Sequence, residues 1–371
     1  MVYVFFIFMR FILPAAGIGS RWGDLTLLGD TKGLFKIGNK EIIGRSFEEM
    51  LFLKPDLVSV VLGHDGENVE RYLRDNYGSS KYDFEFDFVY QDDKDGDGGA
   101  TRIALNSPKM RSYSGQIGIK FIVDTLSTLS KSNQTNLVNI LNSFDMPDAL
   151  VMTDEVDNSG SYGLMVKEDD RLVSMLEASG NPVPGEVAIG EYYFKNASVL
   201  RDTLNFLYRR NLTHNGGKEY KLAQYLDIMI RKGVVKTFLV DNWGDTGSHE
   251  LLLQTHRDIM KVEGNDAQFQ YGDDVKIIPP CHFGKGVSIR NSVIGPNVSI
   301  PDGSHVSDSY LVDTVGVGNG ASIQGVNLDG AVLGKGSKIF GDGNNTLRDK
   351  SHKVKVGPDC NLFLQTRNLI N

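Results

Sequence analysis

The sequence predicts a chain in two parts, an α/β domain with a mostly parallel sheet followed by a parallel β-helix. Up to about residue 250, segments of strand character alternate with segments whose apolar residues have helical spacing, which is typical of parallel strands joined through helices. From Val275 onward, aliphatic residues recur every six positions among regularly spaced glycines, which is the hexapeptide pattern of a parallel β-helix. We therefore expect the first domain over residues 1–250, a linking helix and linker over 251–272, and the β-helix with a C-terminal tail over 273–371.

Composition excludes several classes of function. The 371 residues suffice for two domains, and a net charge of -8 argues against a nucleic-acid partner. Two cysteines, Cys281 and Cys360, cannot build a disulfide framework, and they lack the spacing of a metal site. No apolar run reaches the roughly 18 residues that a membrane span requires. We therefore expect a cytoplasmic protein with no membrane partner.

The first thirteen residues, MVYVFFIFMRFIL, have two interpretations. A signal peptide would carry a basic first segment and a spacer before its cleavage site, and both are missing here. We therefore predict a buried first strand with a short extension before Met9. Translation from Met1 or from Met9 would serve this strand equally well.

A glycine-rich turn follows the first strand, between Ala15 and Gly23, and its chemistry suits phosphate. Gly17 and Gly19 lack a Cβ, so the backbone can approach an anion closely, and successive N–H groups can form an anion nest. Arg21 and Lys32 add positive charge on either side of the turn. No Walker loop is present, and Gly23 falls one place too late for a nicotinamide or flavin fingerprint. An ordinary turn remains the alternative.

Helices and strands alternate through the rest of the first domain. We expect strands over residues 57–62, 84–90, 115–124, 187–194 and 234–240, and helices over 41–53, 67–77 and 248–262. In a mostly parallel sheet the functional residues lie at the carboxyl ends of the strands.

The glycine-rich turn resembles a known signature. Residues 13–21, LPAAGIGSR, followed by Lys32 and Leu34, are similar to the G-x-G-[TS]-R loop and P-K-x-L motif of sugar-1-phosphate nucleotidyltransferases, although Thr31 replaces the proline. The resemblance implies a Rossmann-like domain that transfers a nucleoside monophosphate from an NTP to a sugar 1-phosphate and releases pyrophosphate. It also implies nucleotide contacts from Ala15, Gly17, Gly19, Ser20 and Arg21.

An acidic loop follows the strand that ends near Gln91. Its aspartates lack the ligand order and final glutamate of a calcium-binding EF-hand, so a calcium site is disfavoured. Gln91 and Gly98 resemble the family's strand-end glutamine and the glycine that starts the following helix. A glutamine amide can pair with the donor and acceptor edge of uracil or thymine, which favours UTP or dTTP. An ordinary exposed loop is the alternative.

Two aspartates are candidates for a magnesium site. Asp124 ends the strand predicted over 115–124, where the family has Gly-Asp and this chain has Val123 before it. Asp245 lies in Trp243-Gly-Asp-Thr-Gly-Ser, which resembles the family's W-x-D-[TV]-G-[TS]. The resemblance implies that both acids hold Mg²⁺ as the cofactor, leaving positions for water and phosphate. A helix cap or an incidental turn would explain each aspartate separately.

Candidate sugar contacts lie between these two acids. Tyr162 and Gly163 resemble the family's Y-G-V, and Glu177 resembles the glutamate of its E-K-P motif. Ala178 occupies the place of the family lysine that binds the sugar phosphate, which leaves that contact unassigned. Exposed sheet surface is the alternative reading of Tyr162 and Glu177.

The catalytic hypothesis follows from charge. A sugar 1-phosphate is largely dianionic at neutral pH, since its second pKa is about 6, so its oxygen needs no general base to attack the α-phosphorus. Mg²⁺ on Asp124 and Asp245 would bridge the reacting phosphates, while Arg21 and Lys32 would hold the remaining phosphate charge. Two alternatives stay open: a non-catalytic paralogue that senses sugar nucleotides, favoured by Val123 and Ala178, and a cytidylyltransferase for choline or amine phosphate.

The aliphatic period of the last hundred residues runs through Val275, Cys281, Val287 and Val293, then shifts by one place to Ile294, Ile300, Val306 and Val312. Resemblance to nucleotidyltransferases with such a tail implies a left-handed coil. Some hexapeptide domains transfer acetyl groups through a histidine, and His282 and His305 are the candidates, although a histidine at a coil turn is usually exposed filler. We favour a role of this domain in assembly of a homo-oligomer.

Overall fold

The computed structural model describes residues 9–17, 31–38, 40–63, 65–78, 80–91, 95–122, 125–160, 162–176, 183–263, 271–348, 354–356 and 361–363. The structure divides into two compact units. The first joins Met1–Gly17 to Ser46–Trp243, and the second joins Ile18–Arg45 to Gly244–Asn371. The segment after the glycine-rich turn therefore belongs with the C-terminal part of the chain.

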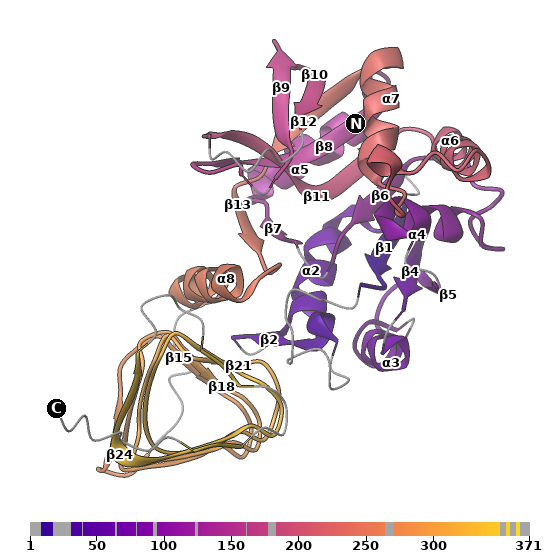
Figure 1. Cartoon of the computed structure of the whole chain (residues 1–371). Helices are drawn as coiled ribbons and strands as arrows, with labels where there is room; N and C mark the ends of the chain where they lie inside the picture. Colours follow the sequence, from indigo (N-terminus) through magenta and orange to yellow (C-terminus); the bar gives the residue numbers. More distant parts are fainter. Residues whose placement is uncertain are drawn as a thin grey trace, which may run out of the picture. The chain divides into compact units, whose positions relative to one another are not determined.

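The first unit is built on a nine-stranded mixed sheet with the order β5-β4-β1-β6-β11-β8-β12-β10-β9. Four adjacent strands, β5, β4, β1 and β6, run parallel, and β8 and β12 form a further parallel pair (Figure 1). The strands are β1 (Arg10–Ala15), β4 (Leu57–Leu62), β5 (Glu85–Tyr90), β6 (Ile117–Lys120), β8 (Ala149–Val156), β9 (Leu164–Glu168), β10 (Arg171–Leu176), β11 (Gly185–Phe194) and β12 (Val235–Leu239).

Apolar residues explain the centre of this sheet. All six residues of β4 are buried, as expected for a strand covered on both faces. A single apolar core joins the central strands to helices α4 (Gly96–Leu105), α6 (Ala197–Arg209) and α7 (Leu222–Lys232). The remaining helices are α2 (Ile42–Met50), α3 (Gly66–Tyr77) and α5 (Lys131–Asn142), with short 3-10 turns at η3 (Leu51–Leu53) and η4 (His214–Gly216).

The predicted strands and helices of this unit are confirmed, with one exception. The strand predicted over 115–124 is shorter, because β6 ends at Lys120. The Phe121 amide donates to the Gly190 carbonyl, and the Thr125 amide donates to the Phe121 carbonyl at 3.1 Å. A separate strand, β7 (Thr125–Thr128), then pairs with β13 (Asn242–Asp245).

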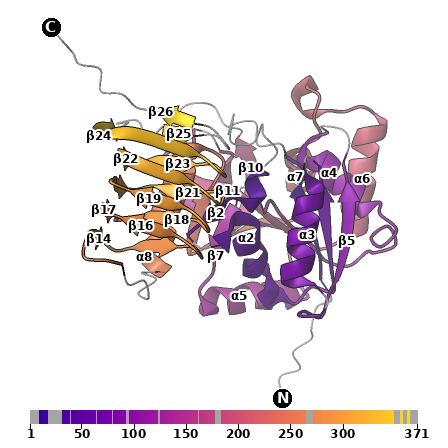
Figure 2. The same cartoon turned by 90° about the horizontal axis from the view of Figure 1, so that it is seen from below.

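The second unit contains the β-helix, whose coils have a three-sided outline (Figure 1) and stack in parallel (Figure 2). Hydrogen bonds join positions 17 residues apart, as in the bond from Asn291 Nδ2 to Asp308 Oδ1. Its strands are β14 (Val275–Ile277), β15 (Cys281–Phe283), β16 (Ser288–Arg290), β17 (Ser292–Ile294), β18 (Val298–Ile300), β19 (His305–Ser307), β20 (Tyr310–Val312), β21 (Val315–Gly316), β22 (Ser322–Asp329), β23 (Ala331–Leu333), β24 (Lys338–Arg348), β25 (Val354–Val356) and β26 (Asn361–Phe363).

The coils turn at three columns of residues with positive φ. The columns contain Asn291, Asp308 and Gly325; Asn297, Asp313 and Gly330; and Gly286, Gly303, Gly320 and Gly336. Glycine, asparagine and aspartate tolerate this backbone conformation best. Because most paired positions of successive coils are 17 residues apart, and some are 16, a strict six-residue period loses its phase.

The predicted aliphatic period is therefore only partly right. Ile294, Ile300 and Val306 are buried as expected, but Val293 is only half-buried. The next inward residue is Leu311, fully buried, and not the predicted Val312. The shortened side of each coil explains this shift, since it moves the inward position back by one residue.

The remaining elements of the second unit precede the β-helix in sequence. They are η2 (Lys32–Leu34), the hairpin of β2 (Lys36–Ile37) and β3 (Lys40–Glu41), and α8 (His249–Glu263). None of the helices in the described part of the chain is long and apolar enough to span a membrane.

Candidate active site

The carboxyl ends of three adjacent strands bring several predicted nucleotide residues to one edge of the first unit. Ala15 ends β1 and pairs with Leu62, the last residue of β4. The next residues approach closely, because a Cβ added to Gly63 would lie 2.6 Å from the Ala16 carbonyl oxygen. Among the described residues, no atom would lie within 4 Å of a Cβ added to Gly17.

Gln91 lies at the same edge, immediately after β5. Its amide N–H donates to the Leu62 carbonyl at 2.8 Å, which fixes the residue next to β4. The side-chain Nε2 is buried, and among the residues that the structure describes it has no hydrogen-bond partner. A buried amide donor without a partner is costly, so this atom is a candidate contact for a ligand.

The start of α4 approaches Gln91, as the sequence motif predicts. A Cβ added to Gly99 would lie 3.6 Å from Gln91 Nε2. Gly98 is required for packing, because a Cβ added there would lie 2.8 Å from the Tyr220 carbonyl oxygen. The Gly98 amide donates a 2.9 Å hydrogen bond to the same oxygen. Asp97 Oδ1 accepts a 2.7 Å bond from the Leu222 amide, and burial raises the pKa of this carboxyl. These bonds fix the start of α4 against the backbone of residues 220–222.

Two of the predicted motifs meet in the first unit, through a residue predicted to contact the sugar. The rings of Tyr162 and Trp243 lie 5.1 Å apart, edge to face. Trp243 Nε1 is buried and has no hydrogen-bond partner within the described ranges. Gly163 packs on β10, where an added Cβ would contact the Met175 side chain at 3.4 Å. Sequence reasoning used Trp243 to identify the motif of Asp245, and it did not assign the indole a contact of its own.

Asp245 lies at the end of β13, where the strand turns into α8. Its Oδ1 accepts a short hydrogen bond from the Gly247 amide, and its carbonyl accepts a 2.8 Å bond from Thr255 Oγ1. Gly244 is needed there, because an added Cβ would lie 2.5 Å from Thr255 Cγ2. The motif therefore builds a rigid turn that fixes the direction of a half-buried carboxylate.

This carboxylate suits a magnesium ion held in part by its substrates. Mg²⁺ usually takes one or two protein carboxylates and completes its octahedron with water and phosphate oxygens. Within the described residues no group of three or more histidine, cysteine, aspartate or glutamate side chains could hold a metal by itself. Asp245 fits a magnesium ion that is held by one or two carboxylates together with water and phosphate oxygens. Asp124, the predicted second ligand, lies outside the described residues.

Lys32 is the predicted cation that the structure describes in the second unit. It begins η2, and its exposed fraction is 4%. Thr31 and Phe35 near it are each 3% exposed, whereas Leu34 and Lys36 are only partly buried. The other predicted residues Gly19, Ser20, Arg21 and Glu177 lie outside the described residues.

Sequence reasoning missed a buried charged cluster in the first unit, which we call the Lys120 cluster. Lys120 is 1% exposed, and its Nζ contacts Glu49 Oε2 at 2.9 Å, Glu191 Oε2 at 3.0 Å and Ser127 Oγ at 2.8 Å. The Tyr193 hydroxyl donates to the other oxygen of Glu191. Burial raises the pKa of Glu49. Burial opposes ionisation of Glu191 as well, but Lys120 and the hydroxyls more than offset it and lower the pKa of that carboxyl.

The Lys120 cluster fixes both ends of the segment between β6 and β7. Lys120 is the last residue of β6, and the Ser127 amide in β7 donates to Glu49 at 2.9 Å. Thr125 adds a bond from its hydroxyl to the Ile189 carbonyl. The sequence offers only a weak signal, a lysine inside the apolar run 117–123, IGIKFIV, and it does not reveal where the strand ends or which residues pair with the lysine.

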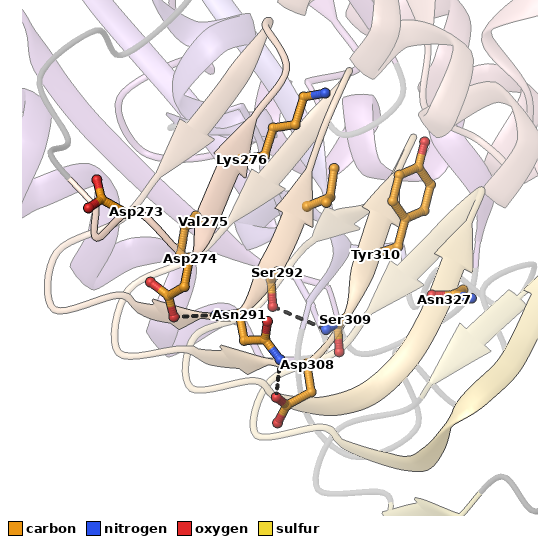
Figure 3. A pocket seen from close by; sticks show the side chains of 11 residues that line it. Asp273, Asp274, Val275, Lys276, Asn291, Ser292, Asp308, Ser309, Tyr310 and Asn327 are labelled. Carbon is orange, nitrogen blue, oxygen red and sulfur yellow. Dashed lines mark hydrogen bonds between the residues drawn. The ribbon is translucent and has the colours of Figure 1, made fainter.

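Two cavities lie elsewhere. One of about 490 Å³ lies on the outer face of the β-helix, where Asp274, Asn291 and Asp308 follow one coil corner and Lys276 and Tyr310 stand on the face (Figure 3). Another, of about 740 Å³, is lined by Asp95, Tyr208, Asn211, Thr213, Gly216, Gly217, Lys218 and Tyr220. Neither lining includes a described residue of the predicted site.

The two histidines considered for acetyl transfer differ in exposure. His305 is exposed in β19, as a coil-turn histidine would be. His282 is 4% exposed, and its Nε2 lies 3.4 Å from Glu263 Oε2. The expectation of an exposed filler side chain is therefore wrong for His282, which is buried beside a carboxylate.

Comparison with known proteins now adds to this geometry. The sequence profile described as "Nucleotidyl transferase" matches residues 11–262, and the profile "GlmU-like, C-terminal hexapeptide" matches residues 274–357. The chain is 21% identical to a glucose-1-phosphate thymidylyltransferase of Streptomyces antibioticus, over 90% of this chain and 89% of that protein. It is 23% identical to the bifunctional protein GlmU of Zymomonas mobilis, over 94% of this chain and 76% of that protein.

A solved structure shares the fold. The crystal structure of HddC from Yersinia pseudotuberculosis superposes with a TM-score of 0.50 and 18% identity. The likeness covers 68% of this chain and all of that protein. At this identity the likeness shows the fold alone.

Proposed function

Because the chain belongs to the nucleotidyl transferase family, we propose that it transfers a nucleoside monophosphate from an NTP to a sugar 1-phosphate, releasing pyrophosphate. The observation that carries the proposal is Gln91. Its buried Nε2 has no partner among the described residues, and it lies at the sheet edge where the glycine-rich turn begins. An amide there can read the uracil or thymine edge, so we propose UTP or dTTP as donor.

The proposal assigns roles to three groups of residues. The proposed nucleotide contacts are Ala15, Gly17, Gly19, Ser20, Arg21, Gln91 and Gly98. Gly98 contributes because its lack of a side chain lets α4 approach the backbone of residues 220–221. The sugar set is Tyr162, Gly163 and Glu177, to which we add Trp243, whose buried Nε1 can donate to a hydroxyl. Asp124 and Asp245 would hold Mg²⁺, and the catalytic set is Arg21, Lys32, Asp124 and Asp245.

The reaction forms one P–O bond and breaks another. An oxygen of the sugar phosphate attacks the α-phosphorus, the bond from that phosphorus to the bridging oxygen of the β-phosphate breaks, and pyrophosphate leaves. Mg²⁺, when bound, would neutralise phosphate charge. Arg21 and Lys32 would hold phosphate oxygens and stabilise the charge of the transition state. The turn at Asp245 keeps its carboxylate in one orientation before substrates arrive.

The hexapeptide domain suggests assembly. We propose that the β-helix is left-handed and joins copies of the chain into a homo-oligomer. Light scattering after size-exclusion chromatography would measure the mass directly, and a monomer at micromolar concentration would contradict the assembly role.

A pyrophosphate-release screen tests the proposed reaction. ATP, GTP, CTP, UTP and dTTP would each be mixed with a panel of sugar 1-phosphates and with phosphocholine, in the presence of Mg²⁺. We expect release with UTP or dTTP and a hexose 1-phosphate, and a loss of about 10²–10³ in kcat for Asp245→Asn and Lys32→Ala. Release from CTP and phosphocholine alone would indicate the cytidylyltransferase alternative. Nucleotide binding without any release would indicate the sensing paralogue.

A further inference from the structure

The segment that carries Lys32 packs on the β-helix. We call residues 31–38 the Lys32 segment; it contains η2 and β2. Figures 1 and 2 both show β2 beside β21 of the β-helix, and the Lys36 amide donates to the Val317 carbonyl at 3.2 Å. A 3-10 turn and a two-residue strand cannot hold their position alone, because isolated strand pairs of this length are unstable in water.

Two side chains of the β-helix fasten the Lys32 segment. Ser299 in β18 is 3% exposed, and its Oγ donates to the Gly38 carbonyl at 2.6 Å. Asp302, in the turn after β18, forms an ion pair with Lys36, in which Asp302 Oδ2 lies 3.3 Å from Lys36 Nζ. These contacts hold the segment at Lys36 and at Gly38, a few residues after Lys32.

A third attachment closes the hairpin from the other side. Arg45 donates through Nε and Nη2 to the Ile37 carbonyl, at 3.0 and 2.7 Å, and its guanidinium also pairs with Glu263 at the end of α8. Glu263 in turn contacts His282 of β15. Gly38 sits inside this group, since an added Cβ would lie 2.9 Å from Arg45 Nη2 and 3.2 Å from His282 Cδ2.

We propose that Ser299 and Asp302 of the β-helix are positioning residues for the transfer reaction, because they hold the backbone of the segment that carries the predicted catalytic Lys32. This inference rests on the proposed function. It assigns the C-terminal domain a role in the transfer step in addition to assembly. Lys32 carries a full charge on a flexible chain, so its contribution depends on where the backbone of its segment is held.

The test compares matched variants of the full-length protein. Ser299→Ala and Asp302→Asn are expected to lower kcat/KM on the order of tenfold, because a small displacement of a charged group weakens its contact with the transition state. The loss should appear in kcat more than in the KM for the sugar phosphate, and Asp302→Glu should restore most of it. Hydrogen exchange of the peptide covering residues 31–41 should accelerate in the two impaired variants.

The controls separate positioning from folding of the β-helix. Ser309→Ala removes another buried serine, 6% exposed, whose hydroxyl bonds only within the β-helix in the described structure, to the Ser307 carbonyl and the Val326 amide. Asp273→Asn removes an exposed aspartate of the same domain. Both should keep wild-type kcat/KM and wild-type exchange of residues 31–41. If they lost activity equally, the effect would belong to β-helix stability and the inference would fall.

The remaining outcomes distinguish this inference from the proposed function. Wild-type kcat/KM in Ser299→Ala and Asp302→Asn, together with a large loss in Lys32→Ala, would overturn the positioning role and leave the transfer reaction intact. Absence of pyrophosphate release from the wild-type protein across the screen would overturn the proposed function, and the inference with it.

Discussion

Two charged clusters in this chain hold segments next to predicted catalytic residues, and they differ in burial. The Lys120 cluster fixes the chain on both sides of residues 121–126, which include Asp124, and its lysine is 1% exposed. The cluster of Arg45, Glu263 and His282, which we call the Arg45 cluster, fixes the hairpin that follows Lys32. Its arginine and glutamate side chains are 12% and 32% exposed.

The difference in burial determines what each cluster can do. In the Lys120 cluster, Lys120 and Glu191 are 1% and 5% exposed, although Glu49 is 18% exposed. Removing the buried lysine leaves carboxylates with little solvent and no cation, which is costly. The Arg45 cluster keeps contact with water, so the loss of a member is partly compensated. We therefore expect the Lys120 cluster to govern stability of the first unit, and the Arg45 cluster to act mainly on the local position of its hairpin.

The largest expected effect is the loss of the buried lysine. Lys120→Met would leave the carboxylates of Glu49 and Glu191 without their cation, and should lower the free energy of unfolding by about 3–5 kcal/mol. Urea unfolding followed by circular dichroism measures this change.

Two further variants test whether the loss comes from a buried charge. Lys109→Met, which removes an exposed pair with Glu85, should cost at most about 1 kcal/mol. Combining Lys120→Met with Glu49→Leu and Glu191→Leu should recover much of the loss, because no buried charge remains. A loss below about 1 kcal/mol in Lys120→Met would show that the Lys120 cluster is not desolvated.

The Lys120 cluster also shows where prediction from the sequence stops. Local patterns predict β1, β4 and β11 well, because each is an apolar run bounded by turn residues. The end of β6 was not predictable, since Lys120 finds its partners on α2 and β11, about 70 residues away along the chain. Only tertiary packing reveals that a lysine is tolerated at that position.

The same limit applies to the candidate site. The motif at Gln91 and Gly98 indicated that a strand end meets a helix start, and the structure brings them together. The packing of the Lys32 segment on the β-helix had no sequence signal, because Ser299 and Asp302 look like ordinary coil residues. The 17-residue coil was also hidden, since one shortened side per coil disturbs a six-residue period only slightly.

The second prediction concerns the Arg45 cluster. Arg45→Met removes the bonds to the Ile37 carbonyl and the pair with Glu263, and should lower the unfolding free energy by about 1.5–3 kcal/mol, the range for hydrogen bonds to charged groups. Arg74→Met is the control, since it removes an exposed helical pair with Glu70 and should cost a few tenths of a kcal/mol. An effect of Arg45→Met as large as that of Lys120→Met would remove the contrast between the clusters.

The third prediction uses pH. Burial acts to raise the pKa of Glu263, but hydrogen bonds from His282 and Arg45 outweigh it and lower this pKa to about 2, from an ordinary 4.5. A carboxyl with a lowered folded-state pKa stabilises the fold above its unfolded pKa, and this contribution disappears as the pH falls toward the folded value.

The measurement is the difference in unfolding free energy between wild type and Glu263→Gln. It should shrink as the pH falls from 4.5 to about 2, and it should be constant above that window. Arg45→Met should show a shallower dependence, because one of the two partners that lower the pKa is gone. A difference that is independent of pH would mean that Glu263 titrates alike in the folded and unfolded chains.

The smallest expected effect on stability is at Asp302, and it separates position from stability most clearly. Its pair with Lys36 lies near the surface, with 41% of the aspartate side chain exposed, so Asp302→Asn should change the unfolding free energy by less than about 1 kcal/mol. The variant also keeps an oxygen that can accept the 2.7 Å bond from the Lys285 amide. If kcat/KM nevertheless falls on the order of tenfold, the loss arises from the position of the Lys32 segment and not from unfolding. A loss of activity that follows a comparable loss of stability would contradict this separation, because a destabilised β-helix would then explain both.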